Sequence, residues 1–234
     1  MSGEFDSVEA LAGRVAEGDV LAVVERIVAE SEPLDAARRL HGLGNHLYWK
    51  VKDLPGSVAA LRAAAQHGLT AAEGDPERRN ALRSEAKGAC YDIASFTWPG
   101  WDEPGIEISA SDIAVGYDAA RTNLRLAQEL EKGDLPLSRG HWMLAGQALA
   151  RLSHDEAIEH YGHGARFAEA AGVEAERLLC KGFASLAGLV AHPEDGGAEA
   201  RVRSALSGLA SLEGGKFFAD QIQAAARVFG CTLE

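Results

Sequence analysis

Apolar residues recur every three or four positions along almost the whole chain, the spacing that places them on one face of an α-helix. One such face is formed by Leu34, Ala37, Leu40, Gly44, Leu47 and Val51. The pattern predicts eleven helices. They span about residues 5–17, 19–30, 34–51, 55–73, Pro76 to the break before Trp98, 110–132, 136–152, 154–172, 173–191, 196–212 and 215–230.

Residues that begin or end helices lie between these segments. Gly18 and Gly74 follow predicted helices, as expected of glycine just past a helix C-terminus, and Asp75-Pro76 places a cap residue before a proline at the start of the next. Ser153 and Glu156 have the spacing of a capping box, in which each side chain bonds a free backbone N–H.

The connections are short, so consecutive helices are expected to run antiparallel. Their buried faces are rich in alanine and glycine, which lets helix axes approach closely. Two steps between successive helix pairs are about 35–40 residues, a period typical of stacked helical hairpins. We therefore predict one all-α domain over 1–234, with an N-terminal helical pair at 1–31, an inserted loop at 97–110 and a capping helix at 213–234.

Two segments resemble the tetratricopeptide repeat, a hairpin of two helices with small and aromatic residues at set positions. The stronger match has an aromatic, a leucine and small residues on its first helix and the string DEAIEHY on its second. Its residues are Trp142, Leu144, Ala145, Ala157, Tyr161 and Gly164. The second match runs from Leu43-Gly44-Asn45 and Tyr48 through Asp53-Leu54 to the segment 58–61.

This resemblance implies a right-handed superhelix whose concave groove binds a peptide or protein. On the first helices of the hairpins, aromatic, cationic and amide side chains are candidates to line that groove. They are Asn45, Tyr48, Trp49, Arg83, Lys87, Tyr91, Arg139, Trp142 and Gln147. Such groups suit an acidic or aromatic peptide; the alternative is that the aromatic residues are core and the cations solvated.

The 97–110 loop contains Trp98 and Trp101, and acidic residues surround them. Exposed tryptophans beside carboxylates would suit a basic, partly apolar partner. Alternatively, both indoles fold back into the seam between the flanking helices, because exposing them to water is costly.

Charge and composition narrow the function classes. The chain carries 23 Lys and Arg against 35 Asp and Glu, a net charge of −12, which repels nucleic-acid phosphates. The three cysteines are widely separated, as expected of free thiols in a reducing cytoplasm. The first ten residues contain no apolar stretch, so we expect no secretory signal, and no apolar run is long enough to span a membrane.

Chemistry-bearing motifs are few. Glu156, His160 and His163 share one face of a predicted helix, where they could hold a divalent metal or form a solvated polar surface; we expect no metal and no cofactor. No catalytic motif is present, so we expect no enzyme. The prediction is a protein- or peptide-binding adaptor. The alternatives are a structural homo-oligomer, formed through Phe217, Phe218 and Phe229, and an enzyme in a helical cavity using His41, His46 or the 154–172 histidines.

Overall fold

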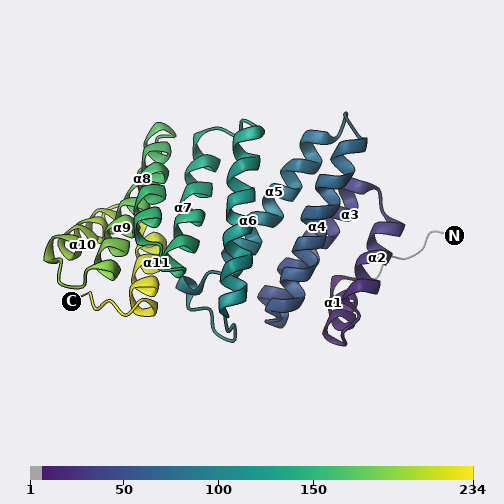
Figure 1. Ribbon diagram of the computed structural model, residues 1–234, viewed down its shortest axis with the longest axis horizontal. Helices are drawn as coiled ribbons and strands as arrows, with labels where there is room; N and C mark the ends of the chain where they lie inside the picture. Colours follow the sequence, from purple (N-terminus) through teal and green to yellow (C-terminus); the bar gives the residue numbers. More distant parts are fainter. Residues whose placement is uncertain (1–6, 234) are drawn as a thin grey trace. The chain divides into compact units, whose positions relative to one another are not determined.

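The computed structural model describes residues 7–233, which form α-helices, one π-helix and one 3-10 helix, with no strand among them (Figure 1). Contacts divide the chain into two compact units. Unit 1 holds residues up to Phe96 together with 105–107, and unit 2 holds 97–104 and the residues from Ile108 onward. The single domain predicted for 1–234 stays a prediction.

Unit 1 contains five α-helices and the π-helix. Successive helices from α1 to α5 pack against one another, and α3 also contacts α5. The elements are α1 (Val8–Ala16), α2 (Val20–Glu30), α3 (Pro33–His46), the π-helix η1 (Leu47–Val51), α4 (Leu54–Gly74) and α5 (Arg79–Phe96).

Unit 2 contains six α-helices and the 3-10 helix. Helices α6 to α11 each pack against the next along the chain, and α11 also contacts α9 and η2. The elements are η2 (Pro99–Trp101), α6 (Ala110–Glu129), α7 (Asp134–Ala150), α8 (His154–Ala170), α9 (Glu174–Ala191), α10 (Gly196–Ala210) and α11 (Gly215–Val228).

Close approach of helix backbones depends on small residues, as the sequence predicts. A Cβ at Gly44 would lie 2.5 Å from Leu61 Cγ, so only glycine lets α3 pack this closely on α4. The Ser57 hydroxyl of α4 then donates to the Gly44 carbonyl at 2.8 Å. The same pairing recurs between α7 and α8, where the Ser138 hydroxyl donates to the Gly164 carbonyl at 2.8 Å. Serine and glycine therefore fix two hairpins by the same contact.

The all-helical prediction is confirmed, and most helix bounds agree to within a few residues. Two local predictions are wrong. The fifth helix begins at Arg79 rather than Pro76, because the Asp75 carboxylate accepts from the Arg78 N–H and holds residues 76–78 in a turn. The Ser153 side chain makes no capping bond. The capping box of this chain lies at Ser109 and Asp112, at the start of α6.

Two further results complete the comparison with the sequence. The first predicted helix, 5–17, starts outside the described residues, as do the outermost positions of the 1–31 and 213–234 segments. Among residues 7–233, no helix has the length and apolar character needed to cross a bilayer.

Candidate functional site

The π-helix at the end of α3 builds the candidate site in unit 1. Over Leu47–Val51 the chain turns more widely than in an α-helix, and the Lys52 N–H bonds back to the Leu47 carbonyl. Lys52 itself has a positive φ of 62°, which ends the helix. Val51 was predicted to share the buried stripe of Leu47, but the wider turn rotates it outward, and it is 41% exposed.

Trp49 lies exposed at the centre of this turn. Its side chain is 53% exposed, although two core aromatic rings support it from below. The indole meets Tyr48 edge-on at 4.8 Å and Phe96 edge-on at 5.7 Å. Those two rings stack on each other at 3.8 Å and are both buried, so the base beneath the indole is rigid.

One cationic group lies near the indole, and a second is its neighbour in sequence. The Lys52 ammonium lies 5.6 Å from the centre of the Trp49 ring, within the range of a cation–π contact, and Lys50 is exposed. We call Trp49, Lys50, Val51 and Lys52 the Trp49 surface. It combines a large apolar face, an indole N–H and two positive charges within four consecutive residues.

A pocket of about 410 Å³ adjoins the Trp49 surface, and Lys52 belongs to both. The lining is completed by Leu54, Pro55, Gly105, Ile106 and Glu107. Its floor is held by the start of α4, where the Asp53 carboxylate accepts from the Gly56 N–H at 2.9 Å. A Cβ at Gly56 would lie 2.2 Å from that carboxylate, so glycine is required there. The pocket offers an apolar wall with one cation, from Lys52, and one carboxylate, from Glu107.

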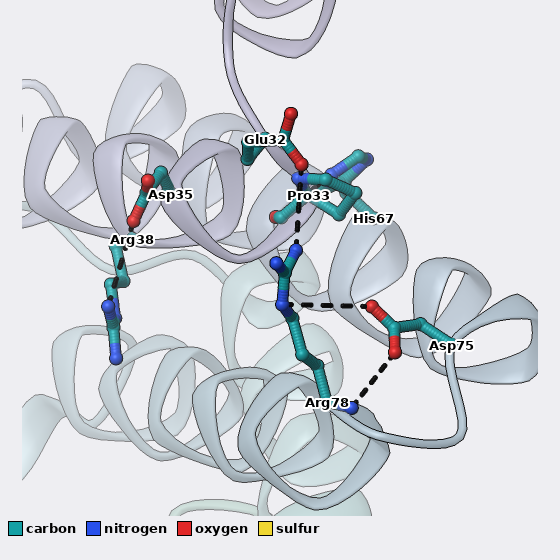
Figure 2. Close-up of polar contacts among 7 residues, drawn as sticks. All are labelled: Glu32, Pro33, Asp35, Arg38, His67, Asp75 and Arg78. Atoms are coloured by element: carbon teal, nitrogen blue, oxygen red, sulfur yellow. Dashed lines mark hydrogen bonds and ion pairs between the residues drawn. The ribbon is translucent and has the colours of Figure 1, made fainter.

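The opposite end of α3 is fixed by polar contacts that involve the α2–α3 and α4–α5 connections and helix α4 (Figure 2). Arg78, in the turn before α5, lies between Glu32 and Asp75, at 3.5 Å and 4.0 Å from their carboxylates. The His67 ring of α4 donates to the Pro33 carbonyl at 3.1 Å. These contacts hold α3 against α4 and α5 at the end away from Trp49.

The other predicted groove residues of unit 1 are dispersed. Tyr48 is buried, so it supports the indole and is no part of an open groove. Asn45 is partly exposed on α3. Arg83, Lys87 and Tyr91 follow one another at every fourth position of α5, all partly exposed, and each already makes an interaction.

The predicted groove residues of unit 2 are mostly core. Trp142 and Gln147 are buried on α7, which corrects their assignment to a groove. Arg139 is engaged in a two-pronged pair with Glu176 of α9, through hydrogen bonds of 2.6–3.2 Å. Its guanidinium joins α7 to α9.

Trp98 of the 97–110 loop is part of the unit 2 core, where it packs on α7 and α9, so this indole is folded back rather than exposed. Trp98 is fully buried, and its indole N–H donates to the Gly146 carbonyl at 2.9 Å. Trp101 meets Trp98 edge-on at 4.9 Å and remains partly exposed. Trp142 packs on both rings. Trp98 is therefore no partner contact.

A charged histidine clamp joins α3 to α5 in unit 1. His41 bonds the Glu85 carboxylate through Nδ1 and the Asp92 carboxylate through Nε2, each at 2.7 Å. A Cβ at Gly88 would lie 3.1 Å from the imidazole, so glycine admits the ring between the two acids. Burial alone would lower the pKa of His41, but the bonds and charges of Asp92 and Glu85 outweigh it and raise the pKa to about 9.

Three histidines meet between α7 and α8 in unit 2. His141 Nδ1 lies 2.9 Å from His160 Nδ1, and the His141 ring stacks on His163 at 5.0 Å. Burial, and then the charges of His160, His163 and Arg166, lower the pKa of His141 to about 4. Glu156, the third candidate metal ligand beside His160 and His163, is used in another contact, because its carboxylate accepts a hydrogen bond from the Tyr117 hydroxyl. Among residues 7–233, no group of three side chains is arranged to hold a metal.

Sequence reasoning missed Lys50, Val51 and Lys52. The one available signal was the run Trp-Lys-Val-Lys directly before the helix-starting segment Asp-Leu-Pro-Gly. Comparison with protein-family models finds none that matches the chain, and comparison with curated proteins finds no match either. The tetratricopeptide resemblance therefore stays a prediction.

Proposed function

We propose that the chain is a protein-binding adaptor built from tetratricopeptide-like helical hairpins, and that unit 1 binds an acidic peptide segment on the Trp49 surface. The peptide would carry an apolar side chain next to its carboxylates. The indole and the adjoining pocket would take the apolar side chain, and the two lysines would take the acids.

The exposure of a rigidly held tryptophan is the observation that carries this proposal. Tryptophan is the residue most often found at the energetic centre of protein interfaces. The rings of Tyr48 and Phe96 hold the Trp49 indole before any partner arrives, so binding costs little side-chain entropy. An indole left 53% exposed gains little for the isolated fold.

The sign of the partner follows from local charge. The chain as a whole is strongly negative, at −12, yet the Trp49 surface contains two lysines and no acid. An acidic peptide would be attracted here, while most of the remaining surface repels it. Glu107 lines the pocket together with Lys52, and this pair of opposite charges favours an uncharged side chain in the pocket itself.

The test is fluorescence anisotropy with a fluorescein-labelled 12-residue peptide of glutamate and phenylalanine, and with its lysine and phenylalanine counterpart. We expect the acidic peptide to bind, and we expect its affinity, but not that of the basic peptide, to depend on Trp49. Replacement of Trp49 by alanine should lower the affinity for the acidic peptide about 30-fold, which is the effect of losing an aromatic side chain at the centre of an interface.

The matched control is Leu21→Ala, which removes another exposed apolar side chain of unit 1, 67% exposed on α2. It should leave the affinity unchanged. Equal binding of the acidic peptide to the Trp49→Ala variant and to the parent chain would contradict the proposal. Raising the salt concentration should weaken binding, because exposed charges are screened.

A further inference from the structure

Five helices in the described part of the chain end in the same backbone motif. In each, the N–H two positions past the helix cap bonds a carbonyl five residues back, at 2.8–3.0 Å, and the residue between has a positive φ. Those central residues are Gly18, Glu131, Leu152, Gly172 and Gly230.

Two of these five residues are not glycine, Glu131 and Leu152, and Leu152, at the end of α7, is the one with an apolar side chain. Its φ is 61°, a conformation that glycine adopts freely and that a branched side chain disfavours. Burial would compensate this strain, but the Leu152 side chain is 68% exposed. Glycine would form the same cap with less strain, as Gly172 does at the end of α8. The isolated fold therefore gains nothing from leucine at this position.

Leu152 borders a pocket of about 500 Å³ between the α7–α8 turn and the end of α9. The lining also includes Ser153, His154, Asp155, Glu156, Ala191 and His192. This lining contains two carboxylates and no lysine or arginine. Arg151, the nearest cation in sequence, lies 4.0 Å above the Tyr117 ring instead.

Two further observations concern the residues on and next to this pocket. The Nε2 atom of His154 is buried with no hydrogen-bond partner among the described residues. Ile158, one turn further along α8, is a second large apolar side chain left 37% exposed. An apolar projection, a carboxylate-lined hollow and an unsatisfied ring nitrogen therefore lie on one part of unit 2.

We propose that Leu152 and this pocket form a second docking surface, which binds a basic peptide segment carrying one apolar side chain. The apolar side chain would pack on Leu152, and a lysine or arginine would enter the pocket and meet Asp155. Strained residues that persist without benefit to the fold are typical of functional sites. This surface is opposite in charge to the Trp49 surface and belongs to the other unit, so the two proposals stand or fall separately.

The experiment uses the full chain and a fluorescein-labelled 12-residue peptide of lysine and leucine. A lysine and serine peptide of equal charge is the comparison, and both are followed by anisotropy. Leu152→Gly should lower the affinity for the lysine and leucine peptide at least 10-fold. The same substitution should raise the thermal midpoint by about 2–4 °C, because it removes the strain at φ 61°. A gain in stability with a loss of binding separates a docking role from a structural one.

The matched control is Glu131→Gly, which relieves the same conformation at the end of α6, where φ is 48°. It should raise the midpoint and leave peptide affinity unchanged. Trp49→Ala should also leave this peptide bound. The proposal is overturned if the parent chain binds the lysine and serine peptide as tightly as the lysine and leucine one, or if Leu152→Gly binds as the parent does.

Discussion

His41 in unit 1 and His141 in unit 2 are both histidines, but at neutral pH His41 is charged and His141 is neutral. Both rings are withdrawn from solvent, and withdrawal disfavours the charged imidazole in both. His41 lies between two carboxylates at 2.7 Å, whereas His141 faces the Nδ1 atom of His160 at 2.9 Å. The partners therefore decide the outcome: the pKa is raised to about 9 at His41 and lowered to about 4 at His141.

The two shifts give the units opposite responses to pH. The raised pKa of His41 stabilises unit 1 fully below the ordinary value of 6.5, and that contribution is lost as the pH rises towards 9. The lowered pKa of His141 gives unit 2 a contribution that is present above 6.5 and lost as the pH falls towards 4. Acid should therefore weaken unit 2, and alkali should weaken unit 1.

The largest effect is expected from removing the charged ring. His41→Leu removes the imidazolium that lies between Glu85 and Asp92, and should lower the free energy of unfolding by about 3 kcal/mol at pH 6. Urea denaturation followed by circular dichroism measures it. The deficit should shrink as the pH approaches 9, since the parent chain loses the same charge there. A deficit that is constant over this range would show that His41 acts by packing alone.

A smaller effect is expected at the neutral ring. His141→Phe keeps an aromatic ring stacked on Phe167 but removes the group that must take up a proton in acid. Between pH 6.5 and pH 4 the variant should lose about 2 kcal/mol less stability than the parent chain. Urea denaturation at both values measures the difference, and His192→Phe, at an exposed histidine, is the control. Parallel losses in the parent and the His141→Phe chain would contradict the comparison.

The smallest effect concerns a neighbour of His141. The positive charge of Arg166 contributes to the lowered pKa of His141, after burial and the two other histidines. Arg166→Gln should therefore raise the pKa of His141 towards its ordinary value. Histidine ring resonances followed by NMR during a pH titration measure it, with the His41 resonance as the internal control. Movement of both resonances would mean that the substitution acts on the fold as a whole.

The helices could be predicted from the sequence because a period of 3.6 residues is a local property, and most helices of residues 7–233 bury one face. Helix α7, which is buried throughout 140–149, differs from the others. The ends of helices could not be predicted where two possible partners compete for the same side chain. The spacing of Ser153 and Glu156 fits a capping box, but Glu156 lies close enough to Tyr117 to accept its hydroxyl instead. A motif predicts a contact only where no better partner approaches in space.

The candidate sites were predicted in part. Trp49 was among the expected binding residues, but its neighbours were not, because the apolar period continues through Val51 while the backbone changes to a π-helix. The His41 clamp was invisible for a different reason: its two acids lie 44 and 51 residues away in sequence. Nothing in the sequence singled out Leu152, because what distinguishes it is its positive φ angle, which the sequence does not show.

The tryptophans are divided between the two units, so the fluorescence of each unit can be followed separately. Trp98, Trp101 and Trp142 lie with ring centres 4.9–5.6 Å apart, close enough to exchange excitation energy, and two of the three are buried. Trp49 stands alone in unit 1 with half its surface in water. Long-wavelength emission therefore follows unit 1, short-wavelength emission follows unit 2, and a single spectrum recorded during unfolding reads both.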